Sequence, residues 1–472
     1  MNTPICDFVR DYVKKDPARF HMPGHKGKEF LLPEPFDLTE VEGADALYEA
    51  DGIIRESEEN AAKVFGTLAT FYSTEGSSLG VRAMLYLAAL YTKEKHPEKK
   101  QVTVLCSRNI HKSVLYSAAL LDLKLVFLPG EQNDSLLGIR TDKEQLLETL
   151  SSMEELPDAV FLTSPDYLGN IADIRGFSEV LKPYAIPLLV DSAHGAYLRF
   201  LSPSLHPTDL GAQLVCTSAH KTLPALTGCA YLHVAEDEAF PERADFFRQE
   251  AKKAMALFGS TSPSYLMLQS LDLLNPYLDS TYKEELGAFI KKADALKTAL
   301  TAGGYKLLGS EPLKITLFAA AYGYSGSEIS EILRENGIEA EYADRDVLVL
   351  MLSPSNTDAE LLSLQEVLLS IERRSPLPKE ALVFPPYLPE IPVREAFFLP
   401  HKVLPAEETV GQIAAEPLVT CPPAVPLVIS GERIREAHLP LFRHYGITRA
   451  SVLAEPFKFG EDEGKTLDKE GG

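Results

Sequence analysis

The chain has 472 residues, enough for roughly three domains, and its 45% hydrophobic and 24% charged residues are typical of an ordinary globular protein. Its net charge of −22 disfavours nucleic acid and anionic membranes as partners. Its five cysteines show no metal-ligand spacing and indicate reduced core residues of a cytosolic protein, and no apolar run is long enough to span a bilayer.

The N-terminal segment, residues 1–60, begins without the basic and apolar regions of a signal peptide, which predicts a cytoplasmic protein. An amphipathic stretch at 6–15 precedes His21-Met22-Pro23-Gly24-His25-Lys26-Gly27. Glycines around a proline exclude regular structure, so we expect a loop whose backbone approaches another group closely. A plain turn and a metal site are the alternatives, but one His-x3-His pair is poor evidence for a metal, and none is predicted.

The first strand of the sheet is predicted at 69–73, and a phosphate-binding turn is predicted directly after it. Gly76, Ser77 and Ser78 follow that strand and precede an amphipathic helix over 81–95. Backbone N–H groups and hydroxyls converge on an anion at such a helix N-terminus. An ordinary helix N-cap is the alternative.

The α/β alternation then continues with strands at 102–106, 125–128 and 158–163. After the first of them, His111 opens a helix, either as a capping group or as a ring stacked on the exposed face of a cofactor. Asp166 lies just beyond the last of these strands. Strands that alternate with helices predict an α/β fold with a parallel sheet.

The apolar run 186–190 ends in Asp191. A carboxylate at the mouth of a buried parallel strand is costly unless it meets a cation or hydrogen-bond donors. The protonated pyridine nitrogen of pyridoxal phosphate (PLP) is such a cation, and an acidic partner keeps the ring an electron sink.

The next buried run, 214–217, leads into Ser218-Ala219-His220-Lys221. Lys221 is thereby placed at the carboxyl edge of the sheet, where open α/β sheets bind ligands. A lysine that extends to solvent is the alternative to a Schiff-base lysine with a pKa lowered by desolvation. Asp191 and Lys221, each at the end of a strand, form the pair that PLP requires.

The remaining elements predict further domains. A strand at 229–234 and a hydroxyl-rich turn at 258–265 complete the sheet domain, and helices and strands from 285 to 373 form a small α+β domain. A Pro-rich connector then leads to short strands around Pro422-Pro423-Ala424-Val425-Pro426. The predicted organisation is an N-terminal segment (1–60), a PLP-binding α/β domain (61–280), a small domain (281–373), a C-terminal α+β domain (374–460) and a disordered tail (461–472).

These segments together resemble the Orn/Lys/Arg decarboxylase family of fold-type-I PLP enzymes, whose large domain is aspartate aminotransferase-like, and most closely its short Bacillus-type members, which lack a wing domain. The matching segments run from residue 20 to about 434: Phe20–Lys26, Ser107–Ser113, Asp191–Gly195, Ser218–Pro224, Thr261–Tyr265, Pro422–Pro426 and Ser430–Glu432.

The resemblance implies roles for individual residues. Lys221 is the Schiff-base lysine, Asp191 the partner of the pyridinium nitrogen, His111 the stacking ring and Ala193 its counterpart on the opposite face. Ser77, Ser78, Ser218 and His220 hold the phosphate, and the turn containing Thr261 and Ser262 reaches the phosphate of a neighbouring subunit, so a homodimer is the minimal active form. The implied cofactor-binding set is Gly76, Ser77, Ser78, His111, Asp191, Ala193, His194, Ser218, His220, Lys221, Thr261 and Ser262.

Three departures from the family pattern put substrate choice in doubt. Glu75 replaces the usual Asn before the phosphate turn, Ser192 replaces Glu, and Asp166 replaces Thr. A carboxylate beside a phosphate is repulsive, so Glu75 is expected to point away.

The implied reaction is PLP-dependent decarboxylation of arginine, lysine or ornithine, in polyamine metabolism, with Lys221 or His220 returning a proton to Cα. Another fold-type-I enzyme, such as an aminotransferase or aldolase, and a catalytically silent paralogue are the alternatives. The substrate's distal cation needs a partner. Glu432 is the first candidate for it, Asp166 the second, and a solvated surface carboxylate is the alternative for each.

Overall fold

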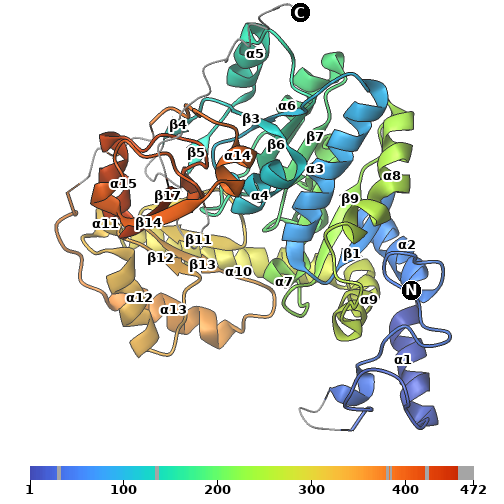
Figure 1. Ribbon diagram of the computed structural model, residues 1–472. Coiled ribbons are helices and arrows are strands. Elements are labelled where there is room, and N and C mark those ends of the chain that lie inside the picture. Colours follow the sequence, from blue (N-terminus) through green and yellow to red (C-terminus); the bar gives the residue numbers. More distant parts are fainter. Residues whose placement is uncertain (29–32, 133–137, 379–381, 383–384, 420–424, 455–472) are drawn as a thin grey trace, which may run out of the picture.

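The computed structural model describes residues 1–28, 33–132, 138–378, 382, 385–419 and 425–454 (Figure 1). The predicted tail at 461–472 and the prolines Pro422 and Pro423 lie outside these residues. Within the described part of the chain, no helix combines the length and apolar character needed to cross a membrane.

A seven-stranded sheet in the order β1-β9-β8-β7-β6-β2-β3 forms the centre of the structure. The five strands from β8 to β3 are mutually parallel, while β9 and then β1 add antiparallel at one edge. The parallel strands therefore all end at one edge, as predicted. The strands are β1 Ala69–Ser73, β2 Thr103–Cys106, β3 Lys124–Phe127, β6 Ala159–Thr163, β7 Leu188–Asp191, β8 Leu214–Ser218 and β9 Ala230–Val234, and a two-stranded hairpin pairs β4 Glu131–Gln132 with β5 Ile139–Arg140.

Helices cover both faces of this sheet, which explains why the strands are continuous apolar runs. Alternate residues of β2 show the two faces, because Val104 and Cys106 pack with α3, α4 and α8, whereas Leu105 packs with α5 and α6. The helices of this part of the chain are α3 Gly76–Lys95, α4 Lys112–Leu121, α5 Lys143–Ser152, α6 Ile174–Leu181, α7 Ala219–Thr222, α8 Pro241–Ala256 and α9 Tyr265–Ser280.

Helix α3 begins at Gly76, five residues before the predicted start at Val81. Serine and glycine are weak helix formers, so periodicity alone placed the start too late. Gly76 has a φ of +71°, which turns the chain from β1 into the helix. Packing against β8 holds this first turn in place, because a Cβ on Gly80 would lie 2.7 Å from the Cβ of Cys216. Ser77 and Ser78 consequently occupy the helix's first turn.

The N-terminal segment contains α1 Pro4–Lys15 and α2 Ile53–Phe65, which pack together and on α9. Figure 1 shows α1 extending away from the main sheet. The predicted loop at 21–27 is a turn held by its own histidines. His21 Nε2 lies 2.8 Å from the Tyr12 hydroxyl, and His25 Nε2 lies 3.3 Å from Asp37 Oδ2. Among the described residues no cluster of three or more side chains suits a metal ion.

The small domain contains an antiparallel sheet in the order β10-β11-β13-β12. One hydrophobic core joins this sheet to α2, α9 and α10, so the small domain is packed against the large one, while the predicted domain boundaries remain predictions. Its elements are α10 Tyr282–Ala302, β10 Leu307–Leu308, β11 Lys314–Leu317, α11 Ala319–Tyr322, α12 Gly326–Glu335, β12 Tyr342–Ala343, β13 Leu348–Met351 and α13 Asp358–Ser370.

The C-terminal part adds two small antiparallel pairs, β14 with β17 and β15 with β16, and α14 packs against α4 of the large domain. Its elements are α14 Val393–Phe398, β14 His401–Pro405, β15 Leu418–Val419, β16 Pro426–Val428, α15 Leu439–His444 and β17 Arg449–Leu453.

The turn 166–170 is one of the places where the small domain meets the carboxyl edge of the main sheet. The Ser310 N–H donates to the Gly169 carbonyl over 2.7 Å, and the Thr316 hydroxyl donates to the Leu168 carbonyl over 2.9 Å. This contact places β11 beside the ends of β6 and β7.

Candidate active site

The register of two parallel strands brings Asp191 and Lys221 to the same edge. Asp191 ends β7 opposite Cys216 of β8, and Lys221 lies on α7, the single helical turn that follows β8. Asp191 is buried, and its Oδ1 accepts hydrogen bonds from the Ala193 N–H (3.1 Å) and the Cys216 thiol (3.6 Å). The other carboxylate oxygen accepts no bond from the described residues, which leaves it for a ligand.

The Lys221 amine lies in a largely dry environment. Its Nζ is 3.2 Å from His194 Nε2. Burial, the largest cause, lowers the pKa of Lys221, and the negative charges of Asp191 and Glu341 oppose that shift. A lysine with a lowered pKa can serve as a nucleophilic amine, which is the property predicted from the sequence.

His111 is the N-cap of α4, where its Nδ1 accepts from the Ser113 N–H over 3.2 Å and lies 2.9 Å from the Ser113 hydroxyl. Burial lowers the pKa of His111, while the charge of Asp191 raises it and that of Lys221 lowers it further. The ring therefore shares one electrostatic environment with both residues. Capping and stacking on a cofactor are compatible, and the stacking role remains a prediction.

The donors around the start of α3 suit a phosphate. A Cβ on Gly76 would meet no atom within 4 Å, so the space beside this helix N-terminus is open. The buried Ser218 hydroxyl has no hydrogen-bond partner among the described residues. His220 uses Nδ1 toward the Cys229 carbonyl at 3.0 Å, which leaves Nε2 for another group. Helix amides, a free hydroxyl and an imidazole are the donor types that a phosphate monoester needs.

Glu75, the departure next to this turn, is engaged elsewhere. Its carboxylate accepts a hydrogen bond from the Ser260 N–H, at the start of the turn that contains Thr261 and Ser262. Thr261 and Ser262 are exposed in the single chain. The residues present therefore fit PLP, and a bonded Glu75 leaves the phosphate donors available.

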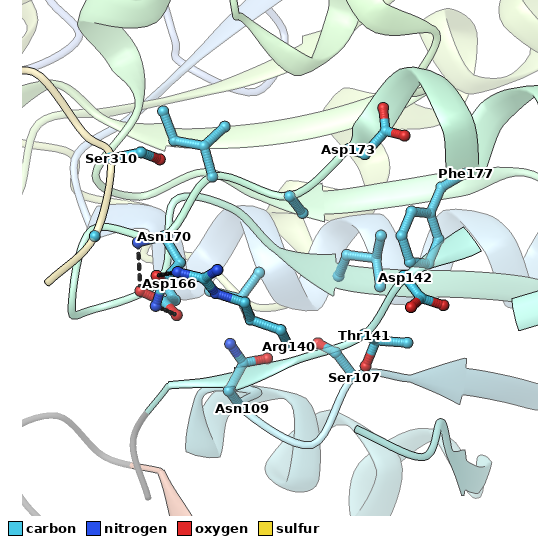
Figure 2. A pocket seen from close by; sticks show the side chains of 15 residues that line it. Ser107, Asn109, Arg140, Thr141, Asp142, Asp166, Asn170, Asp173, Phe177 and Ser310 are labelled. Atoms are coloured by element: carbon cyan, nitrogen blue, oxygen red, sulfur yellow. Dashed lines mark hydrogen bonds between the residues drawn. The ribbon is translucent and has the colours of Figure 1, made fainter. Parts of the chain in front are cut away.

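Asp166, one of the two predicted partners for a substrate cation, is 3% exposed and already bonded. It accepts from the Leu168 N–H and from the backbone and side-chain amides of Asn170 over 2.7–2.9 Å. Figure 2 shows it with Asn170 and Arg140 on the wall of a cavity of about 390 Å³.

Glu432, the other candidate, is 1% exposed. Its two oxygens accept from the Ile429 N–H (2.9 Å) and the Leu388 N–H (3.4 Å). Both candidate carboxylates are thus already bonded to backbone amides, and the assignment of either to the substrate remains a prediction.

Sequence reasoning missed two sets of residues around Lys221. Lys314 and Glu311 form a buried ion pair, with Nζ to Oε2 at 3.0 Å, and Lys314 Nζ also lies 3.2 Å from His194 Nδ1. In the second set, the Tyr167 hydroxyl donates to the exposed carboxylate of Glu341 over 2.8 Å. A lysine inside the apolar run 313–318 was a signal that could have found the first set, because a buried lysine requires partners.

Comparisons with known proteins agree with this geometry. A family model described as "Orn/Lys/Arg decarboxylase, major domain" matches residues 3–314. The arginine decarboxylase of Bacillus subtilis is 28% identical in sequence, with 93% of this chain and 92% of that protein covered. The constitutive lysine decarboxylase structure of E. coli superimposes with a TM-score of 0.75 at 17% identity, covering 96% of this chain and 82% of that one.

A NifS-like protein superimposes more distantly, with a TM-score of 0.51 at 15% identity over 69% of this chain and 91% of that one. These structural likenesses establish the fold, which is the fold-type-I α/β architecture predicted from the sequence. PLP is accordingly the cofactor that the site takes.

Lys221→Ala is expected to abolish turnover and the visible absorbance of lysine-bound PLP, because Lys314, the other described amine beside His194, is buried in its ion pair with Glu311. An absorbance scan checks this, with Lys306→Ala, an exposed lysine of the small domain, as the matched control. Retention of the yellow band, with borohydride fixing the cofactor on another lysine, would contradict the assignment.

Proposed function

This chain belongs to the Orn/Lys/Arg decarboxylase family, and from that premise we propose that arginine is its substrate and agmatine its product. The protein is a PLP-dependent decarboxylase of basic amino acids. The observation that carries the choice of arginine is the likeness to the Bacillus arginine decarboxylase, which extends over more than nine-tenths of both chains.

When bound, PLP supplies an electron sink for the pair released from the bond between Cα and the carboxylate. The protein's own residues set the conditions for that step. Asp191 holds a proton at the pyridine nitrogen, because a buried carboxylate with one free oxygen favours a cation beside it. His111 and Ala193 would hold the ring from its two faces, and Lys221 or His220 would return a proton to Cα.

The substrate's guanidinium group needs an acidic partner near Lys221, and we propose Glu341 in addition to the sequence-based candidates Glu432 and Asp166. Its carboxylate is exposed, and the Tyr167 hydroxyl orients it. Its charge also raises the pKa of Lys221, which indicates that it acts on the space around that amine. A carboxylate can accept two parallel hydrogen bonds from a guanidinium, whereas an ammonium makes a single point contact.

The homodimer and the cytoplasmic location predicted from the sequence are part of this proposal. Phe20 is 95% and Met22 69% exposed on the extended N-terminal segment, which supports their burial by a second copy of the chain. The exposed turn with Thr261 and Ser262 supports its predicted reach toward the neighbouring subunit's phosphate.

Incubation with arginine, lysine and ornithine in parallel tests the proposed reaction. Mass spectrometry of the products is expected to show agmatine formed with the highest kcat/KM. A higher value for cadaverine or putrescine formation would contradict the choice of arginine, and no amine from any of the three would contradict the activity.

Asp191→Asn is expected to retain PLP but to lower kcat by about 10³-fold, which corresponds to about 4 kcal/mol of transition-state stabilisation. The amide carries no charge to keep the pyridine nitrogen protonated, so the electron sink is weakened. Single-turnover kinetics at saturating substrate measure the change. A loss of less than tenfold would show that the Asp191 carboxylate faces another group.

Glu341→Gln is expected to raise KM for arginine roughly ten- to a hundredfold, since a hydrogen bond to a charged group contributes about 1.5–3 kcal/mol. The spectrum of bound PLP should stay normal. Glu339→Gln, two residues earlier and paired with Arg334 on the surface, is the matched control. If KM is unchanged in Glu341→Gln but rises in Glu432→Gln or Asp166→Asn, the guanidinium site belongs to that residue instead.

A further inference from the structure

Three nitrogen-bearing side chains form a row across the edge of the main sheet. Lys221 Nζ lies 3.2 Å from His194 Nε2, and His194 Nδ1 lies 3.2 Å from Lys314 Nζ. Lys221 follows β8, His194 follows β7, and Lys314 begins β11 of the small sheet. His194 and Lys314 are both buried and Lys221 is half-buried, so the contact between His194 and Lys314 is shielded from water.

The far end of the row is a buried ion pair. Lys314 Nζ lies 3.0 Å from Glu311 Oε2, and both side chains are 1% exposed. It also donates to the Asp166 carbonyl over 3.3 Å. The Asp166 carbonyl and His194 Nδ1 are thus two hydrogen-bond acceptors for one ammonium, and the Glu311 carboxylate lies at ion-pair distance from it. A carboxylate this deeply buried needs a cation beside it.

The direction of the hydrogen bonds follows from this arrangement. An ammonium has no lone pair, so Nδ1 of His194 must accept from Lys314. Lys314 can also pass one proton to Glu311, which makes both side chains neutral. The lone pair of the Lys314 amine then accepts a hydrogen bond from the Glu311 carboxyl group, and an N–H of Lys314 still donates to Nδ1 of His194. Nδ1 of His194 therefore carries no hydrogen whether Lys314 and Glu311 are both charged or both neutral.

The state of His194 is then determined. Burial, the largest cause, and the neighbouring Lys314 and Lys221 hold the pKa of His194 well below its usual range, so the ring is neutral. A neutral ring with no hydrogen on Nδ1 carries its hydrogen on Nε2. That N–H points toward Lys221, which must offer a lone pair to accept it.

We infer that the buried Lys314–Glu311 pair, acting through the imidazole of His194, holds Lys221 as an unprotonated amine before the cofactor binds. The inference rests on the proposed role of Lys221 as the amine that takes PLP. Lys314 and Glu311 are positioning residues in this arrangement, since they act on Lys221 through His194.

Other groups around Lys221 oppose or support this state. The carboxylates of Asp191 and Glu341 favour the ammonium form, whereas burial and the charge of Lys314 disfavour it, and the Cys216 thiol also lies in this environment. The imidazoles of His111 and His220 lie near enough to His194 for their charges to lower the pKa of its ring. Tyr167 fixes the plane of His194 through an edge contact between rings, with centroids 5.3 Å apart. The Nε2–H donor is the one contact in this set that requires the free base.

Competitive labelling of the full chain, freed of PLP with hydroxylamine, tests the inference without any catalytic assay. Trace acetic anhydride across a pH series, with mass spectrometry of the Lys221 peptide, reports the fraction of unprotonated amine. In the double variant Lys314→Met with Glu311→Gln, His194 can carry its hydrogen on Nδ1, and labelling of Lys221 at pH 7 should fall at least about tenfold, equivalent to one pKa unit. Lys306→Met, on the exposed face of the small domain, should leave the profile unchanged.

A second comparison distinguishes an effect carried through the His194 imidazole from a direct effect of the Lys314 and Glu311 charges on Lys221. In a His194→Phe background, Lys221 labelling should already be reduced, and adding the two substitutions should change it no further. An unchanged profile in the double variant, or a full additional shift in the absence of the imidazole, would overturn the inference.

The wild-type protein provides a test that does not depend on a variant folding. Nitrogen-15 NMR of histidine-labelled chain without PLP should show His194 with an unprotonated Nδ1 and a protonated Nε2. A hydrogen on Nδ1 would overturn the inference. Because neither experiment uses a substrate, failure here is distinct from failure of the proposed decarboxylation.

Discussion

Burial of ionisable groups at the carboxyl edge of one parallel sheet is the constraint on which the rest of this structure depends. Strands β7 and β8 are buried on both faces, so whatever follows them enters a dry region. An acid and an amine there must each find a partner or change protonation state. Asp191 retains one open carboxylate oxygen, and Lys221 has a lowered pKa. Together they make a site prepared for a cofactor that is cationic at one end and electrophilic at the other.

The docking of the small domain adds further buried ionisable groups behind Lys221 and Asp191. The turn at 166–170 accepts hydrogen bonds from the small domain at two carbonyls, and this contact sets Lys314 beside His194. Lys314 is tolerable there only because Glu311 is buried with it. The electrostatics of the amine are therefore determined jointly by two domains, and a change in their packing would change the protonation of Lys221.

Departures from the family pattern have specific structural consequences. Glu75 lies at the start of α3, whose N-terminus is predicted to bind the phosphate and where a free carboxylate would repel it, but the Ser260 amide holds Glu75. Asp166 provides the oxygen acceptors that close its own turn on Asn170. Its backbone carbonyl, in turn, is one of the two hydrogen-bond acceptors around Lys314. These substitutions thus preserve the frame that carries Lys221 and Asp191.

Sequence alone determined the α/β alternation, the strand ends that carry Asp191 and Lys221, the family, and with it the cofactor and the reaction class. It could do so because buried strands and Gly/Ser turns leave local patterns, and because strand ends in a parallel sheet share one edge. The start of α3 was set too late, since its first turn depends on the approach of Gly80 to β8. Only the tertiary structure revealed that Asp166 and Glu432 are buried and bonded to backbone amides. Only the tertiary structure showed that Lys314, 93 positions after Lys221, contacts the same His194 imidazole as Lys221. Contacts between residues that distant depend on domain packing, which no local pattern records.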